Sequence, residues 1–299
     1  MHSDPGIQAV WEQFGRKISH GRIRDYGQIR YAMRSAFMHA PFIRNFILII
    51  SSKETQIPSW LDTSHPQVKV IEHQDIWDNP SNLPSLNSHA IEWALPNIPD
   101  VAPLLLYFND DVSIQKKLEL SSIWSGTGQF ILHEAWPAPN SASGVKDDFG
   151  KSLAFVKKLY DGKYGLKASR KVGSHIPMLF NTTVMKMIKS DWSKEFEDMY
   201  VNKPFRTPHD MQLQFAYQQY IQHHFPFKIE PDHLHFKVIQ ASFKANERTF
   251  AAIKNSNRQY ICLQDGVEQD FPSTQVLNQI ENFYENMFPT KAPWEITQD

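Results

Sequence analysis

Helical and buried-strand patterns alternate along the first third of the chain. Residues 24–39 place apolar side chains three or four positions apart, which predicts one face of an α-helix. Apolar runs at 45–50, 68–71 and 104–109 predict buried strands, and 88–95 predicts a short helix. Because such alternation is typical of α/β proteins, we expect a Rossmann-like fold with a mostly parallel sheet and flanking helices.

The rest of the chain is predicted to be mainly helical. The expected helices lie near 151–160, at 182–201, from Pro208 onward and from Ser273 onward, and the expected strands lie at 236–241 and 259–263. Thr207 is a suitable N-cap for the helix at Pro208, with Asp210 completing a capping-box-like arrangement. The Pro, Asn, Ser and Gly residues of 137–150 predict a flexible loop.

Two adjacent carboxylates end the apolar run at 104–109. Ligands of open α/β sheets bind beyond the carboxyl ends of the strands, which is where Asp110 and Asp111 are expected. Two hard oxygen donors at that place suit Mg²⁺ or Mn²⁺ bound to the phosphates of a nucleotide. The alternative is that the two residues simply begin a loop and cap the next element.

Composition narrows the class of protein. The 299 residues, 41% of them hydrophobic and 13% aromatic, suit a folded globular chain. A net charge of −1 argues against a general binder of nucleic acid or membrane surfaces. The single cysteine, Cys262, excludes an intrachain disulfide framework and is predicted to be a buried strand residue. No apolar run reaches the roughly 18–20 residues of a membrane span, and no signal pattern is found at the N-terminus.

Several polar side chains are candidates for phosphate or sugar chemistry, each with a plainer alternative. Arg30 and Arg34 lie four apart on one predicted helix, where they clamp a diphosphate or form a solvated face. Glu92 lies near a helix start, where its carboxylate binds a sugar hydroxyl or a metal. The alternative is an ordinary acidic residue that interacts favourably with the positive end of the helix. His175, in a short extended segment, could serve as general base, although most of the 13 histidines cannot be catalytic. Arg206 stands beside a predicted helix N-terminus, a place suited to phosphate.

In this order, the motifs of the chain resemble those of the Stealth family of sugar-1-phosphate transferases. The similar motifs are Arg30–Ser35, Leu83–Glu92 and Tyr107–Val112 for the second family block, His175–Pro177 and Phe205–Gln212 for the third, and Tyr260–Asp265 and Phe283–Pro289 for the fourth. The resemblance implies a single catalytic domain over residues 1–299, with its blocks at 24–112, 173–222 and 258–296.

Two departures from the family pattern accompany this resemblance. Only the tail of the first family block is found, at Ser3-Asp4-Pro5, so we expect the first strand of the sheet to be missing. In the fourth block, Gln264-Asp265-Gly266 stands where the family usually has Asn-Asp-Asn.

The resemblance implies transfer of a sugar 1-phosphate from a UDP-sugar to a hydroxyl of a glycan or polysaccharide, with release of UMP. It implies that Mg²⁺ or Mn²⁺ is held by Asp110 and Asp111, and that the donor is bound by Arg30, Arg34 and Asn109. The implied catalytic residues are His175 as the base, Arg206 beside the phosphates, and Glu92 and Asp210, which orient the sugar or the metal.

Two other functions remain open at this stage: a metal-dependent glycosyltransferase that releases UDP, and an inactive family member that binds carbohydrate or assembles with a partner. The resemblance to eukaryotic members implies the Golgi lumen, and that to bacterial members the cytoplasm. Nucleic acid is not an expected partner, and the sequence leaves the donor sugar, the acceptor and a homo-oligomeric state open.

Overall fold

The structure is a computed structural model that describes residues 5–15, 24–167, 169–201, 204–267 and 272–296. Ser3 and Asp4, the tail of the first family block, lie outside the described residues. The α-helices are α1 (Pro5–Gln13), α3 (Gln28–His39), α4 (Lys53–Gln56), α5 (His73–Ile76), α6 (Ser88–Ala94), α7 (Asp148–Tyr164), α8 (Thr182–Asp191), α9 (Ser193–Tyr200), α10 (Leu213–His224), α11 (Phe243–Lys254) and α12 (Thr274–Met287). The strands are β1 (Phe46–Ile50), β2 (Val68–Glu72), β3 (Leu104–Tyr107), β4 (Val112–Ile114), β5 (Phe130–Pro137), β6 (Lys171–Gly173), β7 (Met178–Asn181), β8 (Phe227–Glu230), β9 (Leu234–Ile239) and β10 (Tyr260–Asp265).

The α/β class predicted from the sequence is confirmed, but the strand pairing is mixed. Among the described residues, β1–β2, β10–β9 and β5–β8 pair in parallel, whereas β10–β4, β3–β7 and β5–β6 are antiparallel. The expectation of a mostly parallel sheet is therefore too simple. An apolar run indicates that a strand is buried, but it does not specify the direction of the neighbouring strand.

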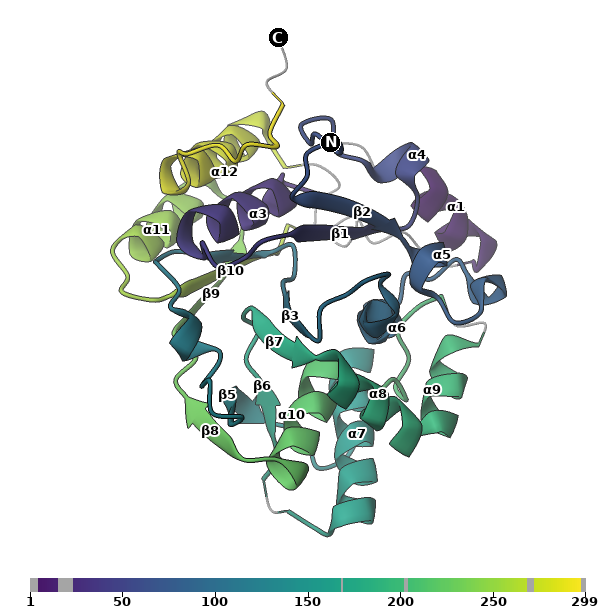
Figure 1. Cartoon of the computed structure of the whole chain (residues 1–299). Helices are drawn as coiled ribbons and strands as arrows, with labels where there is room; N and C mark the ends of the chain where they lie inside the picture. The colour runs from purple at the N-terminus through teal and green to yellow at the C-terminus, as the bar shows by residue number, and fades with distance from the viewer. Residues whose placement is uncertain (1–4, 16–23, 168, 202–203, 268–271, 297–299) are drawn as a thin grey trace.

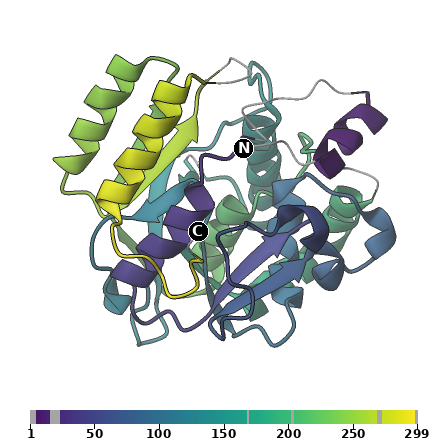
Figure 2. The ribbon, with the colours of Figure 1, turned by 90° about the horizontal axis from the view of Figure 1, so that it is seen from above.

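Helices cover the strands in two groups (Figure 1). Helices α3, α11 and α12 lie beside β9 and β10, whereas α7, α8, α9 and α10 fill the lower part of the molecule. Figure 2 shows α11 and α12 side by side, with α3 next to α12. Tyr31 of α3 stacks on Tyr284 of α12 with ring centroids 4.7 Å apart, which fixes these two helices against each other.

Strand β3 separates two hydrophobic clusters and thereby positions the residues that follow it. Leu105 and Tyr107 pack against the large lower cluster, whereas Leu106 and Phe108 pack against the cluster around β1 and β2. This alternation follows from the period of two in a strand. The prediction that β3 is fully buried within a parallel sheet is wrong, because its residues are only half-buried and its partner β7 is antiparallel. Strand β3 nevertheless ends where the two clusters meet, and Asn109, Asp110 and Asp111 follow shortly after it in the chain.

The helix predicted from Pro208 begins later, at Leu213, where the side chain of Gln212 accepts a hydrogen bond from the Phe215 backbone N–H. One of the expected capping contacts forms: the Thr207 backbone N–H donates to Asp210 Oδ2 at 2.9 Å. It closes a turn instead of a helix, because the Asp210 carboxylate also binds side chains of another segment, as described below. Within the described part of the chain, no helix is both long enough and apolar enough to cross a membrane.

Candidate functional site

The carboxylate of Asp111 connects three segments that are far apart in the sequence. His175 lies between β6 and β7, and its Nε2 is 3.1 Å from Asp111 Oδ1. Cys262, on β10, is fully buried, as predicted, and its thiol lies 3.4 Å from Asp111 Oδ2. Ser174 holds the loop before His175, since its hydroxyl donates to Asp232 at 2.8 Å. The structure therefore brings the predicted base and one predicted metal ligand into contact.

Charges around this pair change the protonation of His175 and Asp110. Burial lowers the pKa of His175, but the hydrogen bond to Asp111 and the charges of Asp111, Glu92 and Asp110 outweigh it, so that the pKa is raised. Asp110 reaches solvent, yet the surrounding protein removes part of its hydration. This desolvation, together with the charges of Asp111 and Asp25, raises the pKa of Asp110 to about 6. Such a concentration of carboxylates favours the binding of a cation.

Glu92 of α6 faces the same region and has one oxygen without a hydrogen bond. Its Oε1 accepts a hydrogen bond from the Tyr107 hydroxyl at 3.1 Å, and that hydroxyl also accepts one from the Asn109 amide at 3.0 Å. Its Oε2 is buried and has no partner among the described residues. Desolvation raises the pKa of Glu92, while the charges of His89, Arg206 and His175 oppose that rise. A buried acceptor without a partner is uncommon and is an observation that points to a ligand.

Arg206 lies close enough to Glu92 for its charge to act on that carboxyl, and it contacts the first residue of α6. Its Nε donates to the Ser88 hydroxyl at 3.0 Å, and its Nη2 donates to the same oxygen. The guanidinium is half-buried, and its positive charge reaches Glu92. Arg206 is thus near the carboxylates without being neutralised by a direct ion pair to one of the described residues.

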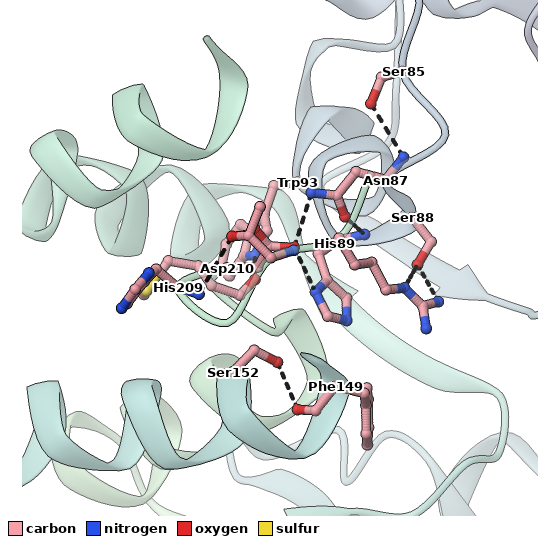
Figure 3. Close-up of polar contacts among 12 residues, drawn as sticks. Ser85, Asn87, Ser88, His89, Trp93, Phe149, Ser152, His209 and Asp210 are labelled. Atoms are coloured by element: carbon pink, nitrogen blue, oxygen red, sulfur yellow. Dashed lines mark hydrogen bonds and ion pairs between the residues drawn. The ribbon is translucent and has the colours of Figure 1, made fainter. Parts of the chain in front are cut away.

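Asp210 is fully buried and contacts polar side chains from the start of α6, among them Asn87 and His89 (Figure 3). Its Oδ2 accepts a hydrogen bond from the Asn87 amide at 2.9 Å and lies 3.3 Å from His89 Nδ1. Its Oδ1 accepts a hydrogen bond from the Thr207 hydroxyl at 2.7 Å. Burial raises the pKa of Asp210, but these hydrogen bonds and the charge of His89 together lower it. Asp210 therefore joins the start of α6 to the turn that carries Arg206.

Arg30 and Arg34 do project from one side of α3, but both make ion pairs with the C-terminal segment. The Arg34 guanidinium is fully buried and binds Glu295 through Nε and Nη2, and Glu285 and the Phe288 carbonyl through Nη1. Arg30 Nε donates to Glu295 at 2.6 Å. These contacts support a structural role, and donor binding by the two arginines stays a prediction.

Several residues of this region were not singled out from the sequence. Tyr107 carried a signal, because it lies two positions before Asn109 and so shares its face of the strand. Asn87 and His89 lie within the family motif Leu83–Glu92, but that motif does not show that both contact Asp210, and Asp25 lies outside the quoted motifs. Cys262 was correctly predicted to be buried, but its contact with Asp111 depends on the pairing of β10 with β4.

Comparison with known proteins gives three matches to one family, all in the expected order. Stealth protein conserved region 2 matches residues 22–131, conserved region 3 matches 174–223 and conserved region 4 matches 251–299. Together these ranges cover more than half of the sequence. The chain belongs to the Stealth family. The resemblance found in the sequence is thereby confirmed, and Asp110, Asp111, His175 and Cys262 lie within the matched regions of this Stealth protein.

Curated relatives are named phosphotransferases. An exopolysaccharide phosphotransferase of Streptomyces coelicolor is 28% identical over 276 residues, which are 90% of this chain and 44% of the relative. The N-acetylglucosamine-1-phosphotransferase subunits alpha/beta of Mus musculus are 36% identical over 137 residues, 44% of this chain and 11% of the relative. This Stealth protein spans about half the length of the bacterial relatives it matches, or less. Among solved structures, the galactosyltransferase LgtC, in complex with donor and acceptor sugar analogues, has a TM-score of 0.42 and 11% identity, covering 90% of this chain and 94% of its own.

Proposed function

We propose that this Stealth protein transfers a sugar 1-phosphate from a UDP-sugar to a hydroxyl of a glycan or polysaccharide and releases UMP. The observation that carries the proposal is the contact between Asp111 and His175, two polar residues 64 positions apart that meet at 3.1 Å beside Asp110. The names of the relatives, exopolysaccharide phosphotransferase and N-acetylglucosamine-1-phosphotransferase, support this reaction class.

In the proposed reaction, the acceptor oxygen attacks the phosphorus nearer the sugar, and the bond from that phosphorus to the oxygen of UMP breaks. His175 takes the proton of the acceptor hydroxyl. Because its Nε2 donates to Asp111 Oδ1, the lone pair lies on Nδ1, which we assign as the basic atom. Asp111 thus orients the base, as the carboxylate does in other carboxylate–histidine pairs.

The carboxylates of Asp110 and Asp111 fit a divalent ion of the Mg²⁺ or Mn²⁺ class. Both offer hard oxygen donors, and desolvation together with the charges of Asp111 and Asp25 raises the pKa of Asp110 to about 6, so a bound cation would stabilise its ionised form. Such an ion, when bound, neutralises charge on the diphosphate. Arg206 would add a second positive charge next to the transferred phosphate, which the guanidinium geometry suits.

Glu92 is proposed to hold a sugar hydroxyl through Oε2, the buried oxygen that has no partner among the described residues. Tyr107 fixes the other oxygen of this carboxylate and also holds Asn109, next to the proposed metal ligands. Asp210 is proposed to act indirectly, since it positions α6 and the turn of Arg206.

Product analysis tests the proposal. The purified chain would be incubated with Mg²⁺ or Mn²⁺, a panel of UDP-sugars and a mannoside acceptor, and the nucleotides separated by chromatography. We expect UMP that depends on the acceptor. Asp110→Asn and His175→Ala should each lower turnover by about 100-fold or more, the range for loss of acid–base catalysis or charge stabilisation.

The matched controls are Asp148→Asn, at the exposed start of α7, and His224→Ala, at the end of α10; both should retain wild-type turnover. Formation of UDP instead of UMP would replace the proposal by a glycosyltransferase. Sugar binding without any nucleotide product, unaffected by metal, would identify a carbohydrate-binding member. Turnover within a few-fold of wild type in His175→Ala would reject His175 as the base.

A further inference from the structure

The site also holds a set of ligand atoms that does not match Mg²⁺. A ring nitrogen of His175, Cys262 Sγ and a carboxylate oxygen of Asp111 all lie within 4.8 Å of one another. Imidazole, thiolate and carboxylate are the ligands that Zn²⁺ takes in proteins, whereas Mg²⁺ and Mn²⁺ prefer oxygen alone. Mg²⁺ chemistry at Asp110 and Asp111 therefore leaves the position of Cys262 unexplained.

The distances in this set suit a tetrahedral ion. Ligand atoms around a tetrahedral Zn²⁺ stand about 3.3–3.8 Å apart, given Zn–N, Zn–O and Zn–S lengths of about 2.0–2.3 Å. Asp111 Oδ1 lies 3.1 Å from His175 Nε2, and Asp111 Oδ2 lies 3.4 Å from Cys262 Sγ. The two contacts use different oxygens of Asp111, so the side chains must rotate to place three donors around one ion, and water would take the fourth position.

Two of the three ligands are accessible to solvent. The side chains of Asp111 and His175 are 17% and 27% exposed, whereas Cys262 is fully buried behind them. The thiol thus forms the floor of the site and the other two ligands its entrance.

We infer that Zn²⁺, or Cd²⁺ as its softer analogue, binds to Asp111, His175 and Cys262 and switches the transferase off. The inhibitory part of this inference rests on the proposed function. Metal binding through Nε2 requires that the imidazole proton sit on Nδ1, the atom assigned above to accept the proton of the acceptor hydroxyl. The thiol proton is released to solvent as the thiolate binds. The bound ion therefore blocks the base and also takes Asp111 away from the activating cation.

A Cd²⁺ titration of the purified chain tests binding without any substrate. Because Cys262 is the only cysteine, a sulfur-to-cadmium charge-transfer band in the ultraviolet reports on this one residue. We expect a band that saturates at one ion per chain, is lost in Cys262→Ser and persists in the double variant His223→Ala/His224→Ala. That variant is the control for adventitious binding by neighbouring histidines at the end of α10.

Inhibition is measured next, in Mg²⁺ with increasing Zn²⁺, and each variant is compared with its own Zn²⁺-free rate. Cys262→Ser removes the thiolate and should raise the Zn²⁺ concentration for half-inhibition by about tenfold or more. Mutation of residues that only hydrogen-bond to metal ligands already lowers metal affinity by roughly 10–100-fold. No band in the folded wild-type chain, or equal inhibition of Cys262→Ser, would overturn the inference. A band in a chain without transferase activity would support the metal site and reject the proposed function, so the two failures are distinguishable.

Discussion

Each oxygen of the Asp111 carboxylate contacts a different side chain: Oδ1 contacts the His175 imidazole, and Oδ2 contacts the Cys262 thiol. Both contacts hold the carboxylate in one orientation, with its charge directed at the ring of His175. The result is an imidazole that remains protonated at a higher pH than a free histidine, although burial acts in the opposite direction. At the scale of single residues, the chemistry of the site thus depends on this one carboxylate.

We predict that His175 titrates above its ordinary pKa of 6.5 in the metal-free protein, and that Asp111→Asn lowers this pKa. The imidazole should therefore stay charged to a higher pH in the wild-type chain than in Asp111→Asn, where a neutral amide no longer stabilises that charge. The measurement is an NMR titration of the imidazole signals, with His175→Ala to assign the peak. His73, whose burial lowers its pKa to about 4, is the internal reference. A His175 signal that titrates below 6.5 would contradict the prediction.

Helix α3 is tied to the end of the chain by an ion-pair network. Arg34 is fully buried, and its partner Glu295 is only 1% exposed, while Glu285 of α12 also accepts a hydrogen bond from Tyr31. An arginine fork between two carboxylates is a strong arrangement as long as it is complete. Arg34 makes four hydrogen bonds in this network. They join helix α3 to α12 and to the segment that contains Glu295.

Removal of Arg34 should therefore affect folding before it affects substrate binding. We expect Arg34→Met to lower the free energy of unfolding by about 3–5 kcal/mol, because it leaves Glu295 buried without its main partner. Arg34→Lys should recover part of this loss, since an ammonium keeps the charge but not the fork. Urea unfolding measures the effect. Unchanged stability combined with a raised KM for the donor would instead support the donor-binding role predicted from the sequence.

The molecule as a whole is built from several hydrophobic clusters, two of which meet at β3. The C-terminal segment closes one of them. Trp294 is fully buried and packs against Phe46 of β1 and Phe37 of α3, with ring centroids 4.5 and 5.5 Å apart. The backbone on both sides of Leu61 bonds to this segment: the Ile296 N–H donates to the Trp60 carbonyl, and the Asp62 N–H donates to the Trp294 carbonyl. The last described residues thus complete the core around the first two strands.

Trp294→Ala should lower the free energy of unfolding by about 3–5 kcal/mol, the usual cost of a large cavity in a core. Trp136→Ala is the matched control, because Trp136 is 51% exposed on β5 and its truncation should change stability by no more than about 0.5 kcal/mol. Urea unfolding followed by circular dichroism compares the two variants. Equal losses in both would show that the C-terminal segment is not part of the cooperative core.

The sequence by itself determined where most elements lie and which residues carry the family motifs. Periodicity located α3, β1, β2, α6 and β10 to within a few residues, because the alternation of apolar side chains is a local property of the chain. The motifs around Asp110 and His175 were likewise readable, since they are short and contiguous.

Only the tertiary structure decided what those residues contact. Spacing placed Arg30 and Arg34 on one side of a helix but could not show that Glu285 and Glu295 occupy that side. The capping pattern at Thr207 was present, yet Asn87 and His89 bind the same carboxylate and the helix begins later. Likewise, Asp111 meets His175 and Cys262 only after three segments fold together. The physical reason is that periodicity reports which face of an element is covered, whereas the identity of a partner depends on contacts between distant parts of the chain.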